Sequence, residues 1–420
     1  MIIKKIVLVM VLSICLLFPI TDVRAFVLTG NSINNNYNNP GARANAMGGA
    51  FIGLADDATA AYTNPAGLTV LTKPEVAAEF KINTHTTRSY DKAITMNSSD
   101  YDSTTYDLSF ASFSYPAGKF NITIYRHTRF NSQNNYQAVS NYKPFPFYQN
   151  NNEDDNREIV AYGLSAAYKV LPNFSLGASI GFCQSTITHS SVTTYTSGSA
   201  STNNMFYDNN AQAQSFSVAL LWNPFSTFNI GMVYRYGPSF DTNVTATNVT
   251  TTTSSYTFKD KTKYPDVYGV GISYSFPFGL TAAFDFDYIK YSQYLKDNVF
   301  YNGTKTLDTY NADEFKVDDN YEIHAGVEYA FNVKETPLAI RGGYCYKRDH
   351  RAYYEPNQDT LTSSVSQTIT ENGLGMGDNG DEHIFSFGFG AVLGKNFQVD
   401  LSGSWGTFTK EYITSLVYRF

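Results

Sequence analysis

The chain has 420 residues, of which only 16% are charged, whereas an ordinary soluble domain carries about 25%. Aromatic residues make up another 16%, yet the mean hydropathy is -0.27, so the apolar groups are dispersed along the chain. This dispersion excludes a bundle of membrane-spanning helices, which needs repeated runs of about 20 apolar residues, and the net charge of -7 argues against a nucleic acid as partner.

Residues 1–25 have the features of a secretory signal peptide. Lys4 and Lys5 precede an apolar run, and a plausible cleavage site follows Ala25. Because this segment holds three cations and one anion, its removal changes the net charge of -7 to -9. We therefore expect an exported mature chain that is more acidic than its precursor.

The three cysteines predict no disulfide framework. Cys15 permits an alternative interpretation of the leader as that of a lipoprotein, although Ile14 is bulky where a small residue is expected. Cys183 and Cys345 would remain in the mature chain, far apart in the sequence.

Residues 26–72 are rich in Gly, Ala and Asn. Gly and Ala permit close packing of backbones, so this segment is suited to fill a lumen that would otherwise hold water. Pro65 suits the first position of a short helix, with Asn64 as its cap. Two interpretations stay open for Asn64, Pro65 and Ala66: the hinge or anchor of a movable plug, or a capped turn in a static one.

Residues 73–420 alternate at period two between apolar or aromatic side chains and polar or small ones. This period indicates β-strands with two unlike faces. About fourteen such segments can be counted, and bacterial outer-membrane barrels have an even number of strands. The apolar phases run over Val76–Ile82, Leu108–Tyr115, Phe120–Phe130, Val160–Tyr168, Phe174–Phe182, Phe216–Trp222, Phe228–Tyr234, Tyr268–Tyr274, Leu280–Tyr288, Tyr321–Tyr329, Leu338–Tyr346, Phe385–Phe389, Phe397–Trp405 and Tyr412–Phe420.

The charged side chains of these segments occupy the opposite phase. In a soluble sandwich that face would meet solvent, and a single strand fits this alternative equally well. The fourteen segments taken together favour a barrel with its apolar face in lipid and its charged face toward the lumen. The charged positions are Glu79, Lys81, Arg235, Asp285, Asp287, Glu322, His324, Glu328, Arg341, Lys347, Asp400 and Arg419.

The connections alternate between short turns and long polar segments, except at the short final hairpin. The long ones cover about 87–103, 131–156, 190–211, 241–263, 293–319 and 351–380. A barrel with both termini on the periplasmic side produces this parity. We predict an all-β transmembrane protein: a 14-stranded antiparallel outer-membrane barrel (73–420) with an N-terminal hatch, or plug, in its lumen (26–72).

The second predicted strand changes phase within itself. Leu108 and Phe110 share one phase, whereas Ala111, Phe113 and Tyr115 share the other. A change of one residue predicts a β-bulge, which bends a strand and disturbs its pairing. The bulge is either a harmless local irregularity or the mark of an opening in the wall.

Several motifs resemble the FadL/TodX family of outer-membrane transporters for long-chain fatty acids and other hydrophobic compounds. In the hatch they are residues 41–51, the Asp-Asp-Ala element at 56–58 and the Asn-Pro-Ala element at 64–66. Residues 264–269 and 381–386 resemble that family's recurrent sequences at the starts of strands. The hatch-like opening is also similar to that of PorV-type barrels of a protein secretion system.

The resemblance implies passive transport: capture of an amphipathic ligand among the outer loops, passage to a lumen pocket and lateral release into the membrane. A PorV-like barrel that interacts with exported proteins is the alternative. An open porin is disfavoured by the hatch. The implied partners are a hydrophobic small molecule such as a long-chain fatty acid, outer-membrane lipid and, because of the terminal Phe420, the barrel-assembly machinery.

Candidate ligand-binding residues follow from the chemistry of a carboxylate with an apolar tail. Arg235 and Arg341 are lumen-facing cations, which alternatively pair with acidic groups across the lumen. Phe145, Phe147 and Tyr148 form an apolar cluster within a long connection. A ligand could first bind there, or the segment could fold inward as a constriction or cap.

Asp56 and Asp57 complete the predicted hatch motif with Asn64, Pro65 and Ala66. No nucleophile with a partner base is recognisable, and the six histidines show no metal-ligand spacing. We expect neither enzymatic activity nor a cofactor.

Overall fold

A computed structural model describes residues 39–89, 99–142, 147–195, 200–207, 211–249, 253–296, 315–350, 353–354 and 380–420. The predicted signal peptide and the Cys15 alternative lie outside these residues. Among the described residues, no helix is both long enough and apolar enough to cross a membrane.

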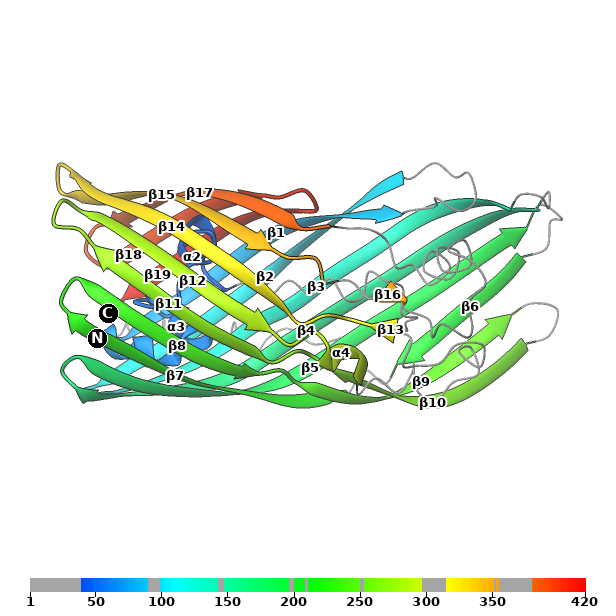
Figure 1. The fold of residues 1–420 in the computed structure, drawn as a ribbon, viewed down its shortest axis with the longest axis horizontal. Helices are drawn as coiled ribbons and strands as arrows, with labels where there is room; N and C mark the ends of the chain where they lie inside the picture. The colour runs from blue at the N-terminus through cyan, green and yellow to red at the C-terminus, as the bar shows by residue number, and fades with distance from the viewer. Residues whose placement is uncertain are drawn as a thin grey trace, which may run out of the picture.

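The described residues form a 17-stranded antiparallel sheet, of which fourteen strands make a closed ring (Figure 1). Pairing of β1 with β19, from Glu75 opposite Arg419 to His85 opposite Thr409, closes the ring. The predicted strand number is therefore confirmed. The ring consists of β1 (Glu75–Ser89), β2 (Ser99–Ala117), β3 (Phe120–Tyr142), β4 (Phe147–Leu171), β5 (Phe174–Tyr195), β7 (Gln212–Phe225), β8 (Phe228–Tyr236), β11 (Val267–Ser275), β12 (Leu280–Ile289), β14 (Asn320–Val333), β15 (Thr336–Lys347), β17 (Glu382–Leu393), β18 (Phe397–Trp405) and β19 (Thr409–Arg419).

The two faces of the ring have the predicted polarity. In β1, Phe80 is 53% exposed on the outside whereas its neighbour Glu79 is 1% exposed on the inside. Along β12, Phe284 and Phe286 point outward while Asp285 between them is fully buried. An outer face of large apolar side chains is what a lipid environment requires, and the hydrophobic effect keeps it out of water.

Three of the segments predicted as long loops are largely strands instead. Both β3 and β4 continue into 131–156, and the rest of the extension consists of β6 (Ala200–Tyr207), β9 (Ser239–Val249) and β10 (Thr253–Lys263). Strand β6 joins β5 to β9, and β9 joins β10, so one side of the barrel rises as a tall wall (Figure 1). We call the end with the short turns the turn end and the opposite end the wall end.

Short elements accompany this wall. They are α4 (Gln293–Lys296) and a separate two-stranded sheet of β13 (Phe315–Lys316) and β16 (Tyr353–Tyr354).

The N-terminal segment lies inside the ring, toward the turn end (Figure 1). It contains α2 (Ala42–Ala46), α3 (Ala60–Thr63) and the 3₁₀ helix η2 (Pro65–Val70). The Asn64 side chain accepts a hydrogen bond from Ala66 N over 3.1 Å and Pro65 is the first helical residue, so the predicted cap is confirmed. Most side chains of the described part of the hatch (39–72) are buried, and this part forms much of the core of the molecule.

Inward-facing glycines of the barrel let hatch and wall backbones touch. A Cβ on Gly343 would lie 2.0 Å from Gly48 N, and one on Gly177 would lie 2.2 Å from Ala66 N. Real Cβ atoms do not approach backbone this closely, so any larger residue at these positions would displace the hatch.

We expect Gly343→Ala to loosen the hatch and to lower the free energy of unfolding by roughly 1–3 kcal/mol, as overpacking does. Gly342→Ala on the same strand is the matched control, because its Cβ meets nothing within 4 Å. The measurement is the temperature at which the folded band converts to the unfolded band on a detergent gel. Equal midpoints for the two variants would contradict the assigned contact.

Candidate functional site

An arginine of the hatch ties it to the barrel wall. Arg43 of α2 forms ion pairs with Asp56 of the hatch and, over 2.8 Å, with Glu328 of β14. Arg341 of β15 donates to the same Glu328 over 2.6 Å and to Asp400 over 2.7 Å. Charges alternate in this chain, so each buried cation has a carboxylate on either side.

Burial and charge act together on the hatch end of this network. Burial raises the pKa of Asp57, whose carboxylate lies 3.9 Å from the Arg43 guanidinium. Burial would lower the pKa of Arg43, but Asp56 and Glu328 outweigh it and raise the pKa above its ordinary value. Arg43 therefore stays a cation, and the network depends on it.

Asparagine and aspartate side chains hold the hatch backbone at further points. Asn64 Nδ2 donates to the carbonyl of Ile52 over 2.9 Å and to that of Leu220 on β7 over 3.1 Å. Asp285 Oδ2 accepts from the amides of Phe51 and Ile52 over 2.5 and 2.6 Å. These bonds satisfy backbone groups of an irregular segment that is buried inside the barrel.

The pairing of β2 with β3 stops part-way along the two strands. Their ladder ends at Phe110 opposite His127, whereas β2 pairs with β1 as far as Ser99 and β3 with β4 as far as Tyr142. Within the described parts of these strands no ladder pair joins β2 to β3 beyond Phe110. We call this the β2–β3 break; it lies in the wall-end half of the ring.

Side chains of β3 replace the missing ladder next to the break. The Arg126 guanidinium donates to the carbonyl of Leu108, and His127 Nδ1 donates to the carbonyl of Ser109 over 3.2 Å. Such bonds are easier to part than a continuous backbone ladder, because a side chain can change rotamer while the strand stays in place.

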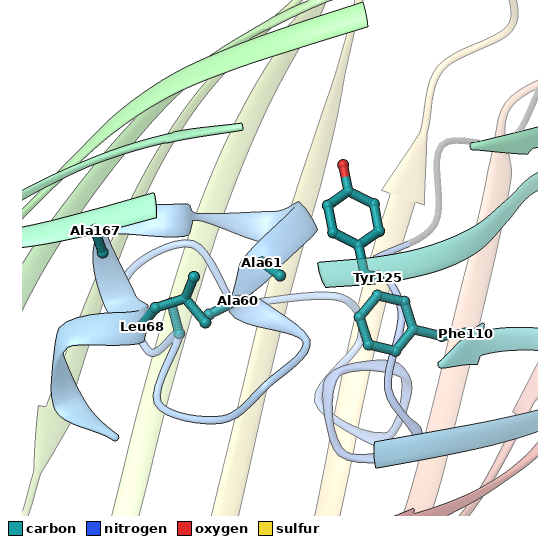
Figure 2. Packing of buried hydrophobic residues seen from close by; sticks show 7 residues of the cluster. Ala60, Ala61, Leu68, Phe110, Tyr125 and Ala167 are labelled. Carbon is teal, nitrogen blue, oxygen red and sulfur yellow. The ribbon is translucent and has the colours of Figure 1, made fainter. Parts of the chain in front are cut away.

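A bulge in β2 lies at the same level and confirms the predicted irregularity. The register with β1 shifts between Glu79, opposite Phe110, and Phe80, opposite Leu108. Phe110 is fully buried, so its assignment to the same face as Leu108 was wrong: the phase changes at Ser109, one residue earlier. Figure 2 shows the Phe110 ring beside that of Tyr125, next to the hatch.

A pocket with about 260 Å³ of empty volume lies between the hatch and the wall near the break. Tyr62 of the hatch lines it, and the Tyr62 ring packs against His127 at a centroid distance of 4.3 Å. The guanidinium groups of Arg129 and Arg235 lie 5.7 and 5.8 Å from the Tyr62 centroid. We call this the hatch pocket; it combines aromatic walls with two cations.

Arg235 is held by weak or partial contacts. Its Nη2 donates to the carbonyl of Thr63 over 2.7 Å, and its Nη1 lies 3.7 Å from the Asp287 carboxylate. Its buried Nε has no hydrogen-bond partner among the described residues. Arg341, by contrast, makes two short hydrogen bonds to carboxylates.

An apolar cluster continues from the hatch pocket toward the wall end. We call it the upper cluster; it consists of Ile159, Ala161, Cys183, Ala211, Phe240 and Tyr264. Cys183 Sγ lies 3.4 Å from Ser215 Oγ and 3.8 Å from Arg129 Nη1, and both of these residues line the hatch pocket. The pocket and the cluster thus form one continuous lining of the lumen.

The predicted site residues fall into separate groups. Asp56 and Asp57 meet at Arg43, Asn64 to Ala66 form the cap of η2, and Arg235 borders the hatch pocket. No described contact joins Arg341 to the hatch pocket. Phe145 and the side chains of Phe147 and Tyr148 lie outside the described residues, so their ligand-binding role stays a prediction.

Sequence analysis did not identify Tyr62, Tyr125, His127 or Arg129. A usable signal was present for two of them, because Tyr125 and His127 lie in the lumen phase of β3 beside outward-facing Ile122 and Ile124. Large rings on the otherwise small and polar inner face of a strand indicate either a packed hatch or a ligand pocket.

Residues 25–365 match the family described as outer membrane protein transport protein (OMPP1/FadL/TodX). No curated protein matches the chain. The Pseudomonas putida toluene transporter TodX is similar in structure, with 12% identity, a TM-score of 0.60 and coverage of 92% of this chain and 99% of that one.

Two further structures show the same fold. The Ralstonia pickettii toluene transporter TbuX has 15% identity and a TM-score of 0.59, with coverage of 92% of this chain and 99% of that one. A Pseudomonas aeruginosa FadL homologue has 12% identity and a TM-score of 0.55, with coverage of 91% and 98%.

We expect Arg43→Met to release the hatch partly, because removing one member of a buried ion-pair network costs about 3–5 kcal/mol. The expected result is a higher single-channel conductance in planar bilayers. Lys395→Met, at an exposed turn, is the control. Conductance equal to that of the wild type would rule out Arg43 as the residue that retains the hatch.

Proposed function

Because the chain belongs to the OMPP1/FadL/TodX family, whose members are non-enzymatic outer-membrane transporters of hydrophobic compounds, we propose that its cargo is a long-chain fatty acid. The cargo binds with its carboxylate in the hatch pocket and leaves sideways at the β2–β3 break. The observation that carries this proposal is a cationic, aromatic pocket whose lining residues Tyr125 and Arg129 flank His127, the β3 residue at which the ladder with β2 ends.

The charge of the hatch pocket favours a carboxylate over a neutral ligand. Arg129 and Arg235 both approach Tyr62, and Arg235 Nε has no hydrogen-bond partner among the described residues. A carboxylate would give that donor a charge-assisted partner. The TodX and TbuX structures are named for toluene, which offers no such group.

The size of the pocket suits the head of a long ligand rather than the whole. Ten residues of the hatch and of four strands line it, and they enclose only a small space. The apolar tail would extend into the upper cluster, which adjoins the pocket at Cys183. Each buried methylene there contributes about 0.8 kcal/mol.

Lateral release follows from the same hydrophobic effect. A fatty acid released into the aqueous periplasm would expose its apolar tail to water. The lipid bilayer, by contrast, adjoins the outer face of β2 and β3 and would take up the tail. Phe110 and His127 stand where the ladder ends, and the hatch packs behind them. In this proposal the hatch motif at 56–57 and 64–66 anchors the floor of the pocket and prevents a free water channel.

We expect Arg235→Met to reduce the apparent affinity for oleate roughly tenfold or more, because a hydrogen bond to a charged group contributes about 1.5–3 kcal/mol. Uptake of oleyl alcohol, which has the same tail without the charge, should be unchanged. The measurement is uptake of both labelled compounds by cells, with Lys395→Met as the control variant. Equal loss for the acid and the alcohol would argue against carboxylate binding.

Closing the β2–β3 break should stop release. The side chains of Asp107 on β2 and Asn131 on β3 are 3.3 Å apart across it. We expect a short thiol-reactive crosslinker on Asp107→Cys/Asn131→Cys to lower oleate uptake roughly tenfold or more, because it would block the exit step.

The matched control crosslinks the paired part of the same two strands. Ser114 and Thr123 are ladder partners whose hydroxyl groups are 2.8 Å apart. Crosslinked Ser114→Cys/Thr123→Cys should transport oleate at the uncrosslinked rate. Full transport through a crosslinked Asp107/Asn131 pair would exclude the break as the exit.

A further inference from the structure

Three potential metal ligands meet on the inner wall, away from the hatch pocket. Glu322 and His324 lie two residues apart on β14, and Cys345 of β15 is the register partner of His324. Their exposed fractions are 2%, 5% and 4%. One donor atom from each lies within 4.8 Å of the other two.

The hydrogen bond of His324 to the hatch sets the state of its ring. His324 Nδ1 lies 2.7 Å from the carbonyl of Gly48, and a carbonyl can only accept, so Nδ1 carries a proton. In the neutral ring the lone pair on Nε2 then points away from the hatch. It lies 3.5 Å from Glu322 Oε2 and 3.7 Å from Asp287 Oδ2.

Within the described part of the chain, several polar atoms of these groups are buried without a hydrogen-bond partner. His324 Nε2, Glu322 Oε1 and Asp287 Oδ1 are buried atoms without a hydrogen-bond partner among the described residues. Cations stand at the margin: Arg235 Nη1 lies 3.7 Å from Asp287 Oδ1, and Lys347 Nζ lies 3.9 Å from Glu322 Oε2. Lone pairs that converge in a buried place need either a proton or a metal ion between them.

We propose that Glu322, His324 and Cys345 bind a divalent transition-metal ion of the zinc class. Sulfur, imidazole nitrogen and carboxylate oxygen are the donors that tetrahedral zinc takes. Water, or Asp287, whose Oδ2 lies 3.7 Å from His324 Nε2, would supply the fourth ligand. With metal–ligand bonds of about 2.0–2.3 Å, the donors of such a site lie about 3.3–3.8 Å apart, so the set must contract by about 1 Å. On binding, Cys345 releases its thiol proton to water and becomes the thiolate ligand.

The surroundings support entry and orientation of the ion. A pocket with about 440 Å³ of empty volume between hatch and wall is lined by Gly48, His324, Cys345 and Lys347. The bond from His324 to Gly48 is the kind of outer contact that orients a metal-binding imidazole. The ion would thereby connect β14 and β15 to the turn that follows α2.

The test is a titration of the folded, detergent-purified protein, produced without a histidine tag, with Co²⁺. We expect one ion per chain and the strong near-ultraviolet band of a cobalt–thiolate bond, which Zn²⁺ then abolishes. Cys345→Ser should lose the band. Cys183→Ser is the matched control, because it removes the other described, equally buried free thiol and should keep the band.

A second variant tests the same proposed site without altering the cysteine. Glu322→Gln should bind Co²⁺ about tenfold or more weakly while retaining the thiolate band at saturation. Absence of the band in the folded wild type, or its persistence in Cys345→Ser, would overturn the proposal. Neither outcome depends on which compound the barrel transports.

Discussion

The decisive constraint on this chain is that a backbone surrounded by lipid must satisfy its own hydrogen bonds. Antiparallel pairing of each strand with its neighbours and closure of β1 on β19 meet this requirement around the ring. The β2–β3 break departs from it, and there Arg126 and His127 donate to carbonyls that the ladder leaves unpaired. In the described residues the wall is therefore less strongly paired at this place than in the continuous ladder of the same two strands.

The interior follows a different rule, because buried charges stand there among the apolar clusters. Carboxylates and guanidinium groups alternate from Arg43 through Glu328 and Arg341 to Asp400. Such a network is costly to desolvate and strongly dependent on each member, so it defines where the hatch sits more than it adds to stability. Glycines on the inner wall also help to fix the position of the hatch, because the hatch and wall backbones contact each other there without side chains between them.

The sequence was sufficient for the fourteen strands, since lipid on one side and charge on the other impose period two. The prediction of long loops was wrong in the tall wall, where Thr, Asn and Ser occupy both faces of β6, β9 and β10. Outside lipid neither face of a strand has to be apolar, so the sequence of such a strand resembles that of a loop. The residues of the candidate sites were harder to predict from the sequence than the strands. Cys345 lies next to His324 only through the register of β14 with β15, and Tyr62 reaches the wall only because the hatch folds back inside.

The height of the wall determines how far from the membrane a solute can first contact the protein. Strand β4 has 25 residues, which at about 3.3 Å per residue span roughly 80 Å, whereas about 10 tilted residues cross the hydrocarbon layer. More than half of β4 therefore projects beyond the membrane. A hydrophobic solute can therefore meet the protein on this projecting part of the wall, at a distance from the membrane surface.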